Sequence, residues 1–246
     1  METIPSTLIQ TLKNARSVAV LTGAGVSAES GVPTFREAQT GLWAQYDPQE
    51  LATPQAFRRT PRLVWEWYSW RRELVSGAAP NAGHVALVEL AAQVPRFTLI
   101  TQNVDGLHQR AGSQNVIELH GNIMRTKCSE DGRFIPSWPP TDDIPPHCPH
   151  CGGLLRPDVV WFGESLPYAA LETAVSAAQS CDIFFAIGTS ALVQPAASLP
   201  FEAMQASAVT IEINPATTPL TNHVDYALTG PAGRVLPALL AAAFPE

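Results

Sequence analysis

The sequence predicts an α/β fold, a doubly wound parallel sheet with a smaller inserted domain. Short runs rich in Val, Ile and Phe alternate with helical patterns, which is typical of a parallel sheet covered by helices on both faces. The first apolar run leads directly into a glycine-rich turn, and two compositionally different segments interrupt the alternation. We expect strands at 17–22, 96–101, 115–119, 182–187 and 208–213, and helices at 81–93, 168–180 and 196–206.

The length and composition limit the class of protein. A chain of 246 residues can bury one sizeable core and carry a small appended module. The net charge of -7 leaves no excess of Lys and Arg, so we expect no nucleic-acid partner. The sequence lacks a signal-peptide pattern, and its longest apolar run, 238–244, is too short to cross a bilayer. We therefore expect a cytoplasmic monomer that does not bind membranes.

The glycine-rich turn follows the apolar run at residues 18–21. Gly23, Gly25 and Ala28 fit the pattern G-x-G-x-x-G/A, in which small residues allow a tight turn, a close approach of phosphates, and close packing of helix and strand. The pattern alone has little specificity. Its continuation contains Ser27, Ser30, Gly31, Pro33, Phe35 and Arg36, which a dinucleotide-binding dehydrogenase does not need.

Polar residues also follow the strand at 96–101. In an open α/β sheet, ligands bind at the carboxyl ends of strands, so Gln102, Asn103 and Asp105 should lie near the glycine turn. An amide and a carboxylate at this position suit a carboxamide and ribose hydroxyls. The alternative is an Asx-rich turn that caps the next helix.

Further strand ends carry chemically useful groups. His120, followed by Gly121, has the side chain best suited to a general base at neutral pH, although a single strand-end histidine can also be structural. We expect His84 and His108 to have structural roles, in core packing or helix capping. Gly188, Thr189, Ser190 and Asn214 stand where a sheet holds the adenosine half of a dinucleotide, and each is also typical of a turn.

Two insertions interrupt the alternating pattern. Residues 123–157 are rich in Pro, Gly, Asp and Cys, with no apolar period long enough for a core helix or strand. Residues 37–79 are aromatic-rich and helical, with Thr60 as the expected N-cap, Pro61 as the first helical residue and Gly77 beyond the end. Four cysteines, two of them in a C-x-x-C pair, indicate a metal or buried thiols rather than disulfides.

The motifs GAGVSAESGVPTFR, TQNVDGLH, ELHG, CPHC, VVWFGE, GTS and EIN occur in this order and resemble the sirtuins, NAD-dependent protein-lysine deacylases. The resemblance covers about residues 17–240. It implies a Rossmann-like NAD domain of residues 1–36, 80–122 and 158–246. The insertions 37–79 and 123–157 would form the small domain, which combines a helical segment and a zinc-ribbon-like module. The implied reaction transfers an acyl group from lysine to ADP-ribose and releases nicotinamide.

The resemblance also implies a role for individual residues. His120 corresponds to the general base, and Asn103 is also expected to be catalytic. Phe35 corresponds to an aromatic residue that shields the reactive ribose carbon. The segment from Val160 to Glu164 corresponds to a strand that pairs with the substrate backbone through Val160, Phe162, Gly163 and Glu164. The expected NAD pocket comprises Gly23, Ala24, Gly25, Ser27, Phe35, Arg36, Gln102, Asn103, Asp105, Gly188, Thr189, Ser190 and Asn214.

Tyr68 and Arg71 suggest which acyl group is removed. They are three residues apart on a predicted helix and share one face, where an arginine fork beside a phenol suits a carboxylate. Y-x-x-R resembles the class III sirtuins, which bind succinyl- or malonyl-lysine. We expect desuccinylation and demalonylation with weaker deacetylation. The alternative is a surface ion pair of Arg71 with Glu66 or Glu73.

The metal module departs from the family pattern. Zinc-binding sirtuins have two C-x-x-C pairs, whereas this chain has Cys148 and Cys151 but only Cys128 of the other pair. Asp131 stands where the fourth thiolate is expected, and zinc accepts carboxylate oxygen. His147 or His150 are alternative ligands, and a module held only by packing is the other possibility.

Three rival functions remain open from the sequence. A dehydrogenase would share the glycine turn, but no acidic residue stands at a strand end about 20 residues later. A non-catalytic NAD-binding module would not require a base such as His120. Protein ADP-ribosyl transfer uses the same first bond cleavage.

Overall fold

A parallel sheet forms the larger part of the protein. The computed structural model describes residues 4–33 and 45–245. Its six-stranded sheet has the order β3-β2-β1-β6-β7-β8, which is the Rossmann order, and the strand order reverses between β1 and β6. This confirms the predicted fold class. The strands are β1 (Ser17–Thr22), β2 (Arg96–Thr101), β3 (Ile117–Glu118), β6 (Ile183–Ile187), β7 (Val209–Asn214) and β8 (Tyr226–Thr229).

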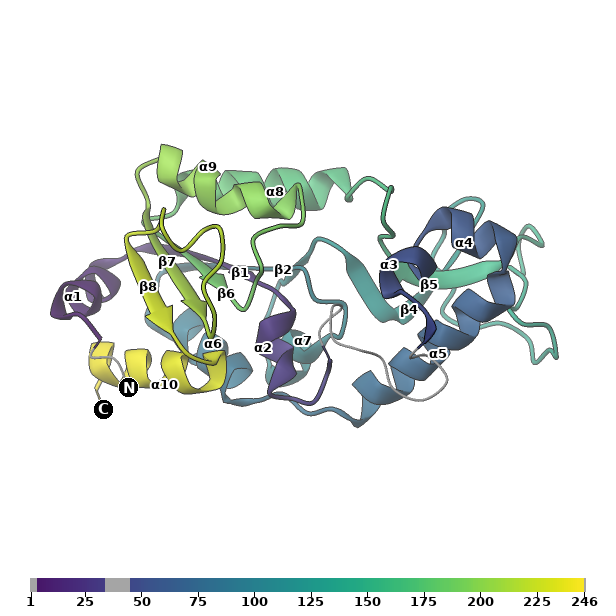
Figure 1. Ribbon diagram of the computed structural model, residues 1–246, viewed down its shortest axis with the longest axis horizontal. Helices are drawn as coiled ribbons and strands as arrows, with labels where there is room; N and C mark the ends of the chain where they lie inside the picture. Colours follow the sequence, from purple (N-terminus) through teal and green to yellow (C-terminus); the bar gives the residue numbers. More distant parts are fainter. Residues whose placement is uncertain (1–3, 34–44, 246) are drawn as a thin grey trace.

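Helices cover both faces of this sheet (Figure 1). One core layer joins Val20 and Phe185 to α6 (Ala82–Gln93) and α10 (Ala232–Ala243), with α1 (Ser6–Asn14) at its edge. The opposite layer joins Leu21 and Phe184 to α8 (Tyr168–Ser180) and α9 (Leu199–Gln205), which follows the 3-10 turn η2 (Ala196–Ser198). Both faces are therefore buried, which explains why the central strands read as continuous apolar runs.

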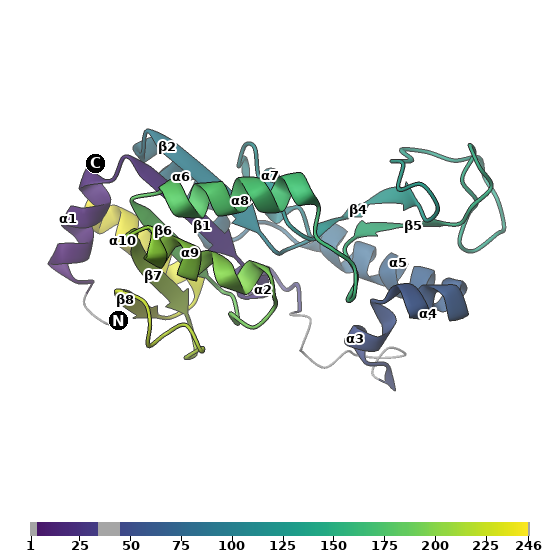
Figure 2. The ribbon, with the colours of Figure 1, turned by 90° about the horizontal axis from the view of Figure 1, so that it is seen from above.

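A second, smaller group of elements lies beside the carboxyl edge of the sheet (Figures 1 and 2). Its core includes Phe57, Val64, Trp67 and Trp161. These residues belong to the predicted insertions and the segments that flank them. The elements are α3 (Pro48–Leu51), α4 (Pro54–Arg59), α5 (Pro61–Gly77), β4 (Gly121–Cys128) and β5 (Leu155–Val159).

The structure corrects two details of the insertions. The expectation that residues 123–157 contain no core strand was wrong, because β4 and β5 form an antiparallel pair. A register shift between Asn122 and Thr126 interrupts the alternation of buried and exposed residues on β4, so the strand pattern is hidden in the sequence. The helix α5 begins at Pro61 as predicted. However, Gly77 is its last residue, and the Thr60 hydroxyl donates backwards to the Ala56 carbonyl instead of capping.

The sequence pattern also missed α1, β8 and α10. In the described residues, no helix is both long and apolar enough to cross a membrane.

Candidate active site

The glycine turn lies at the switch point of the sheet, where β1 leads into the short helix α2 (Ala24–Ala28). The N–H of Gly23 donates to the carbonyl of Ile187, and the N–H of Gly25 donates to Gly188 at 2.8 Å. A β-carbon on Gly25 would lie 2.8 Å from the Gly188 backbone. The contact between these two strand-end loops therefore requires glycine at position 25, whether or not a phosphate approaches the turn.

A buried polar cluster joins the turn to the loop after β2. The Asp105 carboxylate accepts the Ser27 hydroxyl at 2.7 Å and the N–H of Leu107 at 2.9 Å. The Asn103 side-chain amide donates to the Gly23 carbonyl at 3.0 Å and to Ser27 Oγ at 3.2 Å. Three residues predicted from two distant motifs therefore form one fixed constellation.

Thr189 connects three strand ends. Its hydroxyl accepts the side-chain amide of Gln102 at 3.0 Å, and its carbonyl accepts the side-chain amide of Asn214 at 2.7 Å. Ala24, the first residue of α2, and Ser190, in the loop after β6, are both half-buried. The ends of β2, β6 and β7 thus meet where the sequence predicts the remainder of the NAD pocket. Phe35 and Arg36 fall outside the described residues.

His120 lies in the turn between β3 and β4. Its Nδ1 is 3.0 Å from the Gln102 carbonyl. A carbonyl can only accept, so Nδ1 carries the proton and Nε2 is left as the basic nitrogen. Burial lowers the pKa of His120 by more than this hydrogen bond raises it. The imidazole is therefore neutral near pH 7, in the form that a general base requires.

Two further histidines form a buried pair behind the polar cluster. His84 accepts the N–H of Asn81 in the capping box of α6, and its ring lies 4.8 Å from that of His108. Nε2 of His108 lies 2.8 Å from the Thr22 hydroxyl. These contacts confirm the packing and capping roles expected for both residues. Burial, with a smaller effect from the neighbouring His84, lowers the pKa of His108 to about 3.

The helix α5 presents Tyr68 and Arg71 to the interior. They are 2% and 8% exposed, and the Arg71 guanidinium lies 5.3 Å from the Trp67 ring centroid. Burial lowers the pKa of Arg71, while the charge of Asp105 and interaction with Tyr68 oppose that effect. Glu66 pairs with Arg62 at 2.7 Å on the helix surface, whereas Arg71 is buried.

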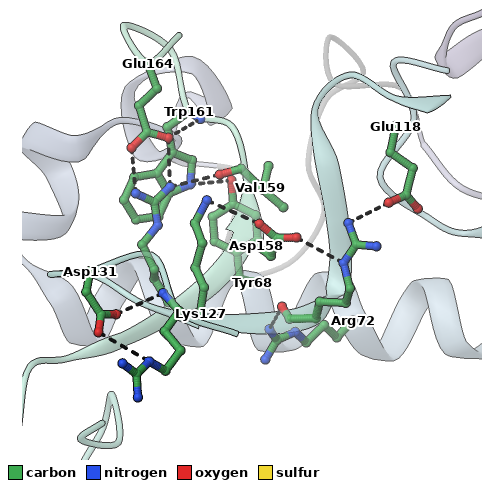
Figure 3. Close-up of polar contacts among 12 residues, drawn as sticks. Tyr68, Arg72, Glu118, Lys127, Asp131, Asp158, Val159, Trp161 and Glu164 are labelled. Carbon is green, nitrogen blue, oxygen red and sulfur yellow. Dashed lines mark hydrogen bonds and ion pairs between the residues drawn. The ribbon is translucent and has the colours of Figure 1, made fainter. Parts of the chain in front are cut away.

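The neighbouring Arg72 has a different environment. It donates to the carbonyls of Ile123 at 2.6 Å and Arg125 at 2.9 Å, and thereby ties α5 to β4. Figure 3 shows Arg72 on α5. The two adjacent arginines therefore have different environments: of the two, Arg71 interacts electrostatically with Asp105, whereas burial is the main influence on Arg72.

The segment from Val160 to Glu164 is not a strand, which corrects the sequence expectation. β5 ends at Val159, and residues 161–164 form a turn in which Gly163 has a φ of 87°. The Val160 N–H bonds the His120 carbonyl at 2.9 Å, and the Phe162 side chain is 42% exposed. The Glu164 carboxylate is engaged within the protein by Arg156 and by the N–H of Trp161.

Sequence analysis missed Trp161 and Arg156. The Trp161 indole donates to the Tyr68 hydroxyl at 2.9 Å, and the Arg156 guanidinium lies 3.3 Å from the indole ring centroid. Trp161 is visible inside the motif VVWFGE, but no local pattern indicates that it reaches Tyr68, 93 residues away.

Three cysteines converge in the module that contains β4 and β5. The sulfurs of Cys128, Cys148 and Cys151 lie within 4.8 Å of one another. Tetrahedral zinc with bonds of about 2.3 Å separates its thiolates by about 3.8 Å, so these three thiols suit a structural zinc. Asp131 is not part of this group among the residues described, and its carboxylate accepts the Arg133 N–H at 2.9 Å.

The fold and this constellation define a dinucleotide-binding protein of the Rossmann class, with the His120 imidazole held by the loop after β2. Comparison with known proteins narrows the class. The model of the Sir2 family matches residues 23–195, and the chain belongs to this family.

Relatives named as NAD-dependent protein deacylases match most of the chain. An NAD-dependent protein deacylase of Methylococcus capsulatus is 51% identical over 243 residues, which cover 96% of this chain and 95% of that protein. A second NAD-dependent protein deacylase, from Aquifex aeolicus, is 55% identical over 210 residues, with 85% and 87% coverage.

Solved structures agree with this assignment. A Sir2 homologue in complex with NAD has a TM-score of 0.89 and 47% identity, and the match covers 98% of this chain and 94% of the other. A Sir2 protein bound to an acetylated peptide has a TM-score of 0.86 and 28% identity, with 97% and 98% coverage.

Proposed function

We propose that this protein is an NAD-dependent protein-lysine deacylase that prefers acidic acyl groups. It would transfer succinyl or malonyl from lysine to ADP-ribose, release nicotinamide and O-acyl-ADP-ribose, and remove acetyl groups more weakly. The observation that carries the acyl preference is the buried pair Tyr68 and Arg71 on one face of α5, with Arg71 within electrostatic range of Asp105.

The loops at the switch point would hold NAD. Bound NAD supplies an electrophilic ribose carbon once its bond to nicotinamide breaks. The bonded cluster of Ser27, Asn103 and Asp105 would orient the nicotinamide carboxamide and the ribose hydroxyls, since its members already fix one another in place. Thr189 and Asn214 would position the adenosine half.

His120 would remove a proton from a ribose hydroxyl. Its Nδ1 proton is held by the Gln102 carbonyl, so only Nε2 is available to accept. The acyl carbonyl oxygen would bond to the ribose carbon as nicotinamide leaves, and the deprotonated ribose hydroxyl would then bond to the acyl carbon. The lysine nitrogen would leave with a proton as the amine, and water would add to the acyl carbon and release the original carbonyl oxygen as the ribose hydroxyl. A neutral base is present at pH 7 because burial lowers the pKa of His120.

Arg71 and Tyr68 would recognise the acid end of the acyl chain. A guanidinium offers two parallel donors to a carboxylate, and a phenol offers a third. Hydrogen bonds to charged groups contribute about 1.5–3 kcal/mol, so acidic chains should bind at least tenfold better than acetyl. An acetyl group offers no carboxylate and gains nothing from either residue.

Paired peptides that differ only in the acyl group test this proposal. We expect the wild type to turn over succinyl-lysine peptide with a higher kcat/KM than acetyl-lysine peptide. Arg71→Met should raise the KM for succinyl peptide at least tenfold and leave the acetyl reaction little changed. Arg62→Met is the matched control, because Arg62 lies on the same helix with its side chain 71% exposed.

The products distinguish the alternatives. Mass analysis should show free lysine peptide, nicotinamide and O-succinyl-ADP-ribose in equal amounts. Equal rates on both peptides would indicate a deacetylase without acidic preference, and ADP-ribosylated protein would indicate a transferase. Binding of NAD without turnover would indicate a non-catalytic module. If Arg71→Met left succinyl turnover unchanged, the acyl assignment would be wrong.

We also propose that zinc binds Cys128, Cys148 and Cys151 in a structural role. The convergence of their sulfurs supports it, and Asp131 remains the proposed fourth ligand. The zinc would tie β4 to the segment that precedes β5 and would not take part in the reaction.

A further inference from the structure

The contact between Trp161 and Tyr68 restricts what the tyrosine can do. Both side chains are 2% exposed, and the indole Nε1–H donates to the phenol oxygen at 2.9 Å (Figure 3). An indole nitrogen can only donate, so it occupies an acceptor position of the phenol. The phenol proton must therefore point away from Trp161. Among residues 4–33 and 45–245, no acceptor takes that proton.

The indole itself is held in place from two sides. The Arg156 guanidinium stacks on its ring and forms a fork with both Glu164 oxygens, at 2.6 and 2.9 Å. The same carboxylate accepts the backbone N–H of Trp161 at 2.8 Å. Phe57 is a further neighbour of the indole, at 5.2 Å between ring centroids. One carboxylate thus fixes the backbone of Trp161 and, through Arg156, its ring.

We propose that Trp161 is a positioning residue for acidic acyl chains, which fixes the Tyr68 hydroxyl as a donor aimed at the acyl carboxylate. This inference rests on the proposed function of Tyr68 and Arg71. A carboxylate only accepts hydrogen bonds, so a phenol that rotated freely would also present its lone pairs and repel the anion. Because burial raises the pKa of Tyr68, the proton needed for donation stays on the phenol.

Trp161 should therefore affect one class of substrate and not the other. Phenylalanine at this position would keep an aromatic ring against Arg156 but remove the indole donor. The value of one oriented hydrogen bond, about 1 to 1.5 kcal/mol, corresponds to a fivefold to tenfold change in KM. An acetyl group does not contact the phenol proton, so its KM should stay within twofold of the wild-type value.

A double-mutant cycle provides the test. We expect Trp161→Phe to raise the KM for succinyl-lysine peptide fivefold to tenfold, with kcat and all acetyl constants within twofold. Tyr68→Phe should have an effect at least as large, and adding Trp161→Phe to it should cause no further loss. Trp138→Phe removes an indole in the zinc module and serves as the control that changes neither KM. Additive effects of the two substitutions, or an equal loss for both peptides, would overturn the proposal.

A second variant covers the case in which Trp161→Phe does not fold. Incorporation of 3-benzothienylalanine at position 161 keeps the bicyclic shape and replaces the N–H by sulfur. It should reproduce the selective rise in KM, and a wild-type KM for succinyl peptide would refute the role of the donor. The Arg71→Met comparison separates the two claims. If Arg71→Met abolishes the succinyl preference while both Trp161 variants retain that preference, the proposed function stands and only the role proposed for Trp161 is refuted.

Discussion

Acid should destabilise this protein through its buried histidine pair. His108 is 1% exposed, and burial beside His84 lowers its pKa from 6.5 to about 3. In the unfolded chain the histidine takes up a proton near pH 6.5, whereas in the folded chain it stays neutral down to about pH 3. The contribution of neutral His108 to the free energy of unfolding is thus complete above pH 6.5 and is lost progressively as the pH falls toward 3.

The size of the loss follows from these two pKa values. At pH 5 the unfolded state gains RT ln(1 + 10^1.5), about 2.1 kcal/mol, compared with about 0.2 kcal/mol at pH 7. The free energy of unfolding should therefore fall by about 2 kcal/mol between pH 7 and pH 5 because of His108 alone. The pKa of His84 is also lowered by burial and adds in the same direction.

Urea denaturation of His108→Gln at the two pH values measures this contribution. The variant should be less stable than wild type at pH 7, but its loss between pH 7 and pH 5 should be smaller by about 2 kcal/mol. Thr22→Val removes the hydroxyl partner of His108 and keeps the imidazole, so it should retain the pH-dependent loss. If His108→Gln showed the full wild-type loss on acidification, the attribution to this buried imidazole would be incorrect.

Two further predictions concern the base and the metal. His120→Gln should lower the rate of deacylation by about 10²- to 10⁴-fold, while NAD binding measured by calorimetry stays near the wild-type value. The wild-type kcat/KM should rise with pH through a pKa below 6.5, because burial lowers the pKa of His120. Purified protein should contain one zinc per chain by metal analysis. Cys148→Ser and Asp131→Ala should each reduce that content and the Tm, and full retention of zinc by Asp131→Ala would remove it as a ligand.

The fold could be predicted because both faces of the sheet are buried. The runs at 18–21 and 183–187 are continuously apolar, which predicts strands buried on both faces, as in a parallel sheet. β8 was missed because it is an edge strand of four residues with exposed positions. α1 was also missed, since it buries only Leu8 and Leu12 completely.

Residues of the site could be predicted where they stand at strand ends in recognisable motifs. Asn103 and Asp105 fall into this group, and the parallel sheet brings them to Ser27 without further assumptions. Trp161 could not be found in this way, because its partner lies 93 residues away on α5. The same limit applies to Glu164, whose ion pair with Arg156 is a tertiary contact that no spacing rule gives.

The electrostatic interaction of Arg71 with Asp105 indicates why the proposed acyl receptor would need a neutral phenol. A bound acyl carboxylate would bring a second negative charge toward the single guanidinium that Asp105 already stabilises. An ionised tyrosine would add a third and would repel the substrate. Burial prevents this by raising the pKa of Tyr68, and the Trp161 donor satisfies the phenol oxygen without adding charge. The proposed receptor would thus offer three hydrogen bonds to an anion from one guanidinium and one neutral phenol.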